Sequence, residues 1–170
     1  MKKLVIGFMS FAMAGMMMVP ISAEDSNTSL NVSYQEPNTY TVSIPKSIQL
    51  NKDGSTSSSN EVKITTSDVN IEPNGKIKVS INSGIDNGVL KLDRNNDTST
   101  KVQTMVTVNG ITDSITTNTV VATFSGDHGE NVVGGTLTFS EVKNVGNDAT
   151  IKAGTYSGKV VFSIAGPTKN

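Results

Sequence analysis

One stretch near the end of the chain, residues 153–164, reads AGTYSGKVVFSI. Its even-numbered positions from 156 onward include Tyr156, Val160, Phe162 and Ile164, and its odd-numbered positions carry Ser157, Lys159, Val161 and Ser163. A period of two is typical of a β-strand, because successive side chains point to opposite faces of a sheet. The stretch therefore predicts one half-buried strand over residues 155–164, in an antiparallel sheet that has its other face in water.

The rest of the chain repeats this signal in short segments rich in Thr, Val and Ile, which fit a pleated sheet better than a helix. We expect strands at residues 30–34, 39–44, 47–50, 61–66, 76–82, 89–93, 101–108, 119–124, 135–142 and 155–164. Polar loops separate them, the longest at residues 51–60, at 125–131 and between 93 and 100. About ten short strands with turns between them predict an all-β fold, an immunoglobulin-like antiparallel β-sandwich.

The first residues are typical of a secretory signal peptide. Met1-Lys2-Lys3 precedes an apolar run from Leu4 to Val19, and Pro20-Ile21-Ser22-Ala23 offers a cleavage site after Ala23. The run is shorter than the about 20 residues of a membrane helix, so a signal peptide is favoured over a retained anchor. We therefore expect a signal peptide (1–23), a flexible lead-in (24–29), a single β-sandwich domain (30–166) and a C-terminal tail (167–170). The protein is expected to be secreted or at the cell surface, with no membrane insertion after cleavage.

The composition argues against several classes of function. The chain has no cysteine, so it has no disulfide, no thiolate nucleophile and no lipoprotein anchor. Its formal net charge is −1 at pH 7, and loss of Lys2 and Lys3 with the signal peptide makes it more acidic. We therefore expect no binding to nucleic acid.

Aromatic residues are few, and tryptophan is absent. After the signal peptide they are Tyr34, Tyr40, Phe124, Phe139, Tyr156 and Phe162, most of them in alternation with other core positions. This pattern is more typical of a core than of the flat platform of a sugar-binding protein. An alternative for Tyr156, which lies between Gly154 and Gly158, is a corner tyrosine whose hydroxyl caps a backbone turn.

His128 is the single histidine, in the segment Gly126-Asp127-His128-Gly129-Glu130. It could act as a general base oriented by Asp127 or Glu130, or as a metal ligand together with both carboxylates. A solvated loop tip is favoured, because adjacent residues of an extended loop point apart and the chain has neither a cysteine nor a serine elbow. We therefore assign no catalytic residue and predict that the protein is not an enzyme.

Four oxygen-bearing residues lie near two neighbouring turns: Asp86, Asp93, Asn95 and Asp97. Calcium takes about six to eight oxygen ligands, but residues 93–97 lack the glycine and the terminal glutamate of an EF-hand loop. Turn residues that bond to their own backbone are the favoured interpretation. We assign no metal site and no cofactor, and calcium at these four residues is the alternative.

Two segments carry a resemblance: YTVSIPKSIQL at residues 40–50 and AGTYSGKVVFSI at residues 153–164. They resemble a group of small secreted proteins of Gram-positive gut bacteria, which pair a V-x-I-P-K-x-I-x-L strand near the mature N-terminus with an A-G-T-Y-S-G-x-V-x-F-x-I strand at the end. The resemblance implies an immunoglobulin-like surface or adhesin-like domain. The closing strand is also similar to the last strand of secreted pilin and spore-coat-type sandwiches.

Three functions remain open on the sequence. The favoured hypothesis is a non-enzymatic secreted or cell-surface protein with a structural or adhesive role, whose partner is a protein or a glycan at the cell surface. One alternative is a pilin-like subunit that assembles with itself, when an N-terminal segment such as residues 30–34 pairs with the sheet edge of the next copy. The other alternative is an extracellular carbohydrate-binding accessory domain.

Overall fold

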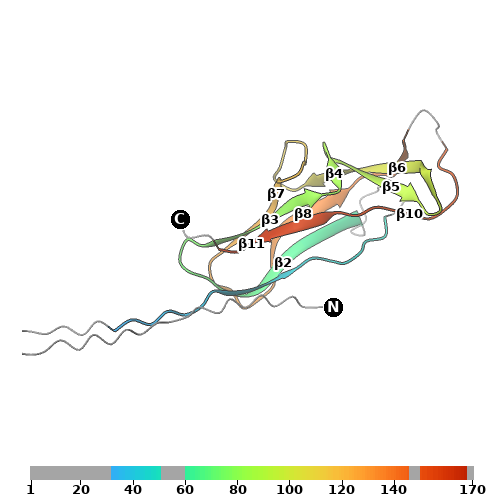
Figure 1. Ribbon diagram of the computed structural model, residues 1–170. Coiled ribbons are helices and arrows are strands. Elements are labelled where there is room, and N and C mark those ends of the chain that lie inside the picture. Colours follow the sequence, from blue (N-terminus) through green and yellow to red (C-terminus); the bar gives the residue numbers. More distant parts are fainter. Residues whose placement is uncertain (1–31, 51–59, 146–149, 168–170) are drawn as a thin grey trace, which may run out of the picture.

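The computed structural model describes residues 32–50, 60–145 and 150–167 (Figure 1). In these ranges the chain forms eleven strands and no α-helix, and every strand pairing is antiparallel. The prediction of an antiparallel all-β fold is therefore confirmed. The predicted signal peptide (1–23) and lead-in (24–29) lie outside the described residues.

The strands follow one another along the whole described chain. They are β1 (Thr39–Ser43), β2 (Glu61–Asn70), β3 (Lys76–Ser83), β4 (Ile85–Asp86), β5 (Val89–Arg94), β6 (Asp97–Val108), β7 (Val120–Ser125), β8 (Val132–Phe139), β9 (Lys143–Asn144), β10 (Tyr156–Ser157) and β11 (Val161–Ala165). Strands β2 and β3 show the period of two most clearly, because apolar or threonine side chains at every second position are buried.

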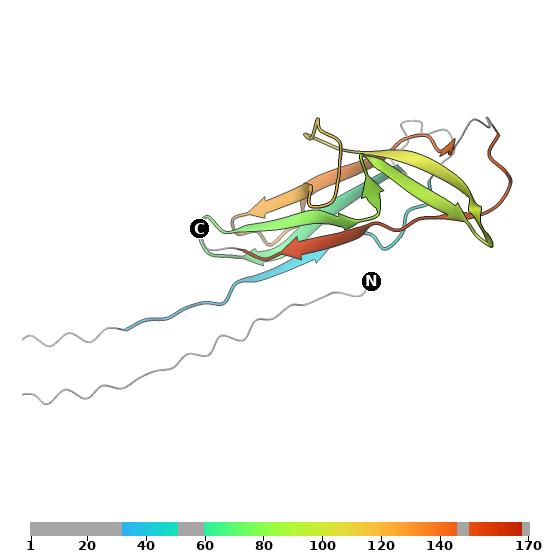
Figure 2. The same ribbon diagram turned by 45° about the horizontal axis from the view of Figure 1, so that its top comes forward.

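The strands form two sheets. The larger sheet has eight strands in the order β1-β2-β8-β6-β5-β10, with β4 paired to β5 and β9 paired to β6, and the smaller sheet has the order β11-β3-β7. Strand β6 joins two parts of the larger sheet, since residues 106–108 pair with β8 whereas its earlier part pairs with β5. Figure 2 shows the tip of the β5–β6 hairpin at one end of the molecule, and the segment before β1 extending away at the other.

Both sheets contribute to one hydrophobic core. Its fully buried members include Ile64 of β2 and Leu137 of β8 in the larger sheet, and Ile77, Val79 and Ile81 of β3 in the smaller one. Most core residues are branched aliphatic side chains, as expected for a sheet protein without cysteine or tryptophan.

Two glycines of β8 allow β7 of the smaller sheet to approach the larger sheet closely. A Cβ on Gly135 would lie 2.0 Å from the carbonyl oxygen of Val121, and a Cβ on Gly134 would lie 2.4 Å from the ring of Phe124. Neither distance is compatible with a side chain larger than hydrogen. The Gly134-Gly135 pair therefore sets the contact between the two sheets along this side.

The prediction of a single strand over residues 155–164 is wrong. Tyr156 and Ser157 pair with Arg94 and Asp93 of β5 in the larger sheet, whereas β11 pairs with β3 in the smaller sheet. Residues 158–160 lie between the two pairings and belong to no strand. The alternation of apolar and polar residues indicates which side chains face the core. It does not indicate that the segment changes its neighbouring strand partway along.

Two other predicted strands do not form in the residues that the structure describes, and one predicted loop is mostly strand. Residues 32–34, the described part of the predicted strand 30–34, are exposed and unpaired with any described strand, and residues 47–50 are also irregular. Ile48 and Leu50 nevertheless pack against the core, so their apolar character reflects burial without sheet pairing. The predicted loop between residues 93 and 100 shrinks to a tight turn at Asn95 and Asn96, where Asn96 has a φ of 67°.

Candidate binding groove

The two segments that carry the resemblance lie far apart in the sequence and meet in space. Both line an open groove of about 340 Å³, and we call them its two walls. One wall comprises residues 44–48 with Leu50, and the other comprises residues 156–160 with Phe162. Both walls follow directly from strand ends, since β1 ends at Ser43 and β10 at Ser157.

The floor of the groove is apolar. Val62 of β2, Leu90 and Leu92 of β5, and Leu137 and Phe139 of β8 line it. All except Leu92 are also buried members of the core, and Leu92 is half-buried. The groove is therefore a place where the hydrophobic core opens to solvent, and a ligand that fits it would cover apolar surface.

The charged residues that line the groove are Lys46 and Lys159, one on each wall, and both are exposed. The neutral polar residues Ser47 and Ser157 also line it. No acidic side chain is among the lining residues of this described groove. The groove thus combines an apolar floor with a positively charged rim.

The main chain of the two walls differs in its surroundings. Across the described part of the chain, residues 45–50 and 158–160 make no hydrogen bond to another main-chain group. Unpaired amide and carbonyl groups of an extended segment are a template for the addition of another strand. The second wall is packed against other main chain, since the Lys159 carbonyl oxygen lies 2.0 Å from the Cβ position of Gly84 and the Lys91 carbonyl oxygen lies 2.8 Å from that of Gly158. The groove therefore offers an apolar surface and, among the described residues, unpaired main chain along residues 45–50.

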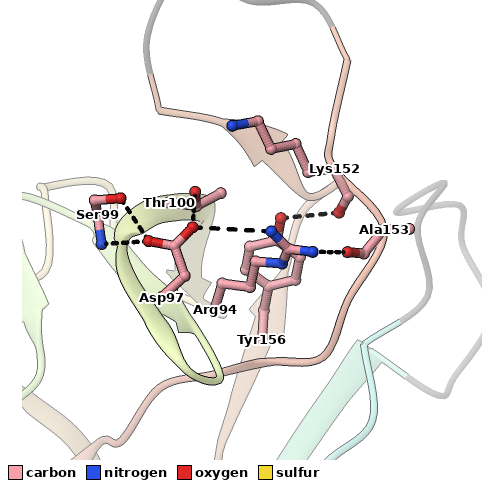
Figure 3. Close-up of polar contacts among 7 residues, drawn as sticks. All are labelled: Arg94, Asp97, Ser99, Thr100, Lys152, Ala153 and Tyr156. Carbon is pink, nitrogen blue, oxygen red and sulfur yellow. Dashed lines mark hydrogen bonds and ion pairs between the residues drawn. The ribbon is translucent and has the colours of Figure 1, made fainter.

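The segment before β10 is tied to the turn between β5 and β6 (Figure 3). The Arg94 guanidinium donates to the carbonyl oxygen of Ala153 at 2.5 Å, and the Tyr156 hydroxyl donates to that of Lys152 at 2.9 Å. The Asn95 amide donates to the carbonyl oxygen of Thr155 at 2.8 Å. The corner-tyrosine alternative for Tyr156 is confirmed by its bond to Lys152, and these contacts position one wall of the groove.

The carboxylate of Asp97, a predicted calcium candidate, accepts hydrogen bonds from neighbouring protein groups. It accepts bonds from the Ser99 amide at 3.1 Å, the Ser99 hydroxyl at 2.5 Å and the Thr100 hydroxyl at 2.6 Å, with Arg94 at 3.8 Å (Figure 3). The Ser99 and Thr100 bonds lower the pKa of Asp97 from 3.8 to about 2. This is the turn chemistry that the sequence favoured.

The other three calcium candidates do not join Asp97 in one site. Asp93 pairs with Lys101, and the Asn95 side-chain oxygen accepts from the Ser157 hydroxyl at 3.1 Å. Asp86 lies opposite Val89 at the far end of β5, and four residues of strand span about 13 Å. The described residues contain no group of three or more His, Cys, Asp or Glu side chains that could hold a metal.

His128 lies in the connection between β7 and β8, as predicted, but it is half-buried and anchored rather than a solvated tip. Its main chain exchanges two hydrogen bonds with Val69, at 2.8 and 3.0 Å. Its Nδ1 donates to the carbonyl oxygen of Glu130 at 3.0 Å, so in the neutral ring Nε2 accepts from the Thr66 hydroxyl at 3.1 Å.

Neither neighbouring carboxylate orients the imidazole of His128. The Asp127 carboxylate accepts from the Ile71 amide at 3.1 Å, and Glu130 contributes its main-chain carbonyl. His128 thus anchors the β7–β8 connection to β2, and Asp127 anchors it to Ile71 just after β2. Thr66 lies 62 residues earlier in the chain, so local sequence patterns gave no signal for this contact.

Most aromatic residues lie in or against the core. Phe124 and Phe139 are buried, and Tyr40 and Phe162 pack against the core from partly buried positions. The other two described aromatic residues lie outside this cluster: Tyr34 is 85% exposed, and Tyr156 bonds through its hydroxyl to Lys152. The described aromatic side chains therefore present no exposed group of flat rings.

Comparison with known proteins gives no relative. No protein-family model, no curated protein and no solved structure matches this chain. In the ranges that the structure covers, no helix has the length and apolar character needed to cross a membrane.

Proposed function

We propose that this chain is a non-enzymatic secreted or cell-surface protein with an immunoglobulin-like β-sandwich fold and a structural or adhesive role. The observation that best supports this function is the groove lined by residues 44–50 and 156–162, which combines an apolar floor with unpaired main chain along residues 45–50. The export signal in residues 1–23 supports the location, and two antiparallel sheets around one core support the sandwich.

The groove suits an extended peptide segment of a partner protein. Strand addition combines main-chain hydrogen bonds with pockets for alternate side chains. Residues 45–50 offer the main-chain hydrogen bonds, and the floor around Leu92 and Phe139 offers the apolar pocket. Adhesion through this groove needs no catalytic residue and no metal.

A pilin-like, self-assembling subunit is the second candidate. It is favoured by Val32 and Tyr34, which alternate in an extended segment and are 86% and 85% exposed. A carbohydrate-binding accessory domain is less well supported, because the exposed surface lacks a platform of aromatic rings among the described residues.

The test compares groove variants of the exported protein for retention on the envelope fraction of the cells that produce it. We expect Ile48→Asp and Lys46→Glu to lose retention, because the first places a charge against the apolar floor and the second reverses the charge of the rim. Ser163→Asp, an exposed position of β11 that does not line the groove, is the matched control and is expected to retain binding.

Equal retention of the unaltered protein and the three variants, or no retention of any of them, contradicts an adhesive role for the groove. Circular dichroism at the start of each assay establishes that the variants are folded. The same proteins on a glycan panel separate the alternatives, since groove-dependent binding to a glycan supports the carbohydrate-binding function.

A further inference from the structure

The segment before β1 exposes apolar side chains in a regular pattern. Val32 and Tyr34 are 86% and 85% exposed, and the polar residues Ser33 and Gln35 alternate with them. In Figures 1 and 2 this segment leads away from the sheets as an extended chain. The segment therefore has the side-chain pattern of a half-buried strand, but it pairs with no described sheet.

The groove and this segment are complementary in polarity. An extended segment that places Val32 and Tyr34 on the apolar floor turns Ser33 and Gln35 toward solvent. The main chain of the segment can then bond to residues 45–50, which make no main-chain hydrogen bond among the described residues.

The charges also match. Glu36 lies on the same face of the extended segment as Tyr34, whose hydroxyl donates to the Glu36 carboxylate. The groove carries Lys46 on one wall and Lys159 on the other, and no acidic residue lines it. When the segment lies in the groove, the Glu36 carboxylate is therefore attracted by Lys46 and Lys159 at the rim.

The segment and the groove lie at opposite ends of β1. Residues 32–38 precede Thr39, whereas the groove begins at Ile44, just beyond Ser43. Five residues of strand separate the two features, and the segment before β1 extends away from the sheets (Figure 2). The segment is therefore placed to reach another molecule, and a donor at one end with an acceptor at the other makes a contact that repeats head to tail.

We propose that residues 32–36 of one copy of this chain dock as an added strand in the groove of a second copy, with Val32 and Tyr34 on its apolar floor. This inference rests on the proposed function, because it names the occupant of the same groove. Repetition of the contact yields an open linear polymer.

The test uses the absence of native cysteine. We place two cysteines in the exported chain, Tyr34→Cys in the segment and Ile48→Cys in the groove, and oxidise the protein in solution. The expected result is a ladder of disulfide-linked multimers on non-reducing gels that collapses to monomer on reduction. The matched control, Tyr34→Cys with Ser163→Cys, places the second thiol outside the groove and is expected to give no ladder above background.

A second measurement avoids crosslinking. We expect Val32→Asp with Tyr34→Asp, and separately Ile48→Asp, to be monomeric in sedimentation at concentrations where the unaltered chain associates. A mixture of these two proteins restores one donor and one acceptor, so it is expected to form dimers and no longer species. That result is specific for docking of the segment into the groove.

Two outcomes overturn the proposal. One is a Tyr34→Cys, Ile48→Cys chain that stays monomeric or closes only within one molecule, and the other is a mixture that stays monomeric. If either occurs while Ile48→Asp still abolishes envelope retention, the adhesive function of the groove stands and only self-docking fails. If retention is also insensitive to Ile48→Asp, the proposed function fails as well.

Discussion

Asp97 shows how a single turn residue couples the fold to pH. Bonds from the Ser99 and Thr100 side chains lower its pKa in the folded protein from 3.8 to about 2. Because the folded pKa lies below the unfolded one, the carboxylate stabilises the fold at pH values above about 4, and this contribution is lost as pH falls toward 2. We expect the stability of Asp97→Asn, measured as the urea midpoint, to change less between pH 5 and pH 2 than that of the unaltered protein.

A direct titration separates Asp97 from the other carboxylates. Ser99→Ala removes the largest cause of the lowered pKa, so NMR titration of the Asp97 carboxyl should move its pKa back toward 3.8. Thr98→Ala alters an exposed neighbour that does not bond to Asp97 in the described contacts, and it should leave the titration unchanged. The same shift in both variants contradicts the assigned cause.

At the scale of the element, alternation in the sequence predicts strands well where one partner persists along the segment. Strands β1, β3 and β7 begin and end within a residue of their predicted limits. The method fails at residues 155–164, where the chain leaves β5 and joins β3, and at residues 47–50, which are apolar but unpaired. Both failures arise because a side-chain pattern records burial and does not identify the neighbouring strand.

Gly84 allows residues 158–160 to pass close to the end of β3 where the chain crosses from β10 to β11. It follows β3 with a φ of 101°, and a Cβ there would lie 2.0 Å from the carbonyl oxygen of Lys159. We expect Gly84→Ala to lower the free energy of unfolding by more than about 3 kcal/mol, since both the positive φ and a main-chain clash must be relieved. Chemical denaturation checks the value.

Gly110→Ala is the matched control for the backbone conformation. Gly110 has a φ of 82°, but nothing lies within 4 Å of its Cβ position. Gly110→Ala should therefore lower the free energy of unfolding only by the penalty for an alanine in the left-handed conformation, about 1–2 kcal/mol. Equal losses in the two variants mean that the approach of Lys159 to Gly84 does not constrain the crossover.

At the scale of the whole molecule, the groove could not be predicted from the sequence, although both of its walls stand out in it. Residues 40–50 and 153–164 are recognisable separately, but nothing local indicates that they line one groove over the floor of β5 and β8. Pro45 is the nearest sequence signal, because it ends β1 and leaves the following residues unpaired. The juxtaposition depends on strand order, which is a property of the complete fold.

The shared core predicts that the two sheets unfold together. Ile81 of the smaller sheet and Leu137 of the larger sheet are 0% and 1% exposed and belong to one cluster. We expect Ile81→Ala and Leu137→Ala each to cost about 2–5 kcal/mol, and each to shift a single unfolding transition that is the same by circular dichroism and by calorimetry. Ile164→Ala, at a position of β11 that is 36% exposed, is the control and should cost less. A biphasic transition in either core variant would mean that one sheet is stable without the other, and the two sheets would then not constitute one cooperative unit.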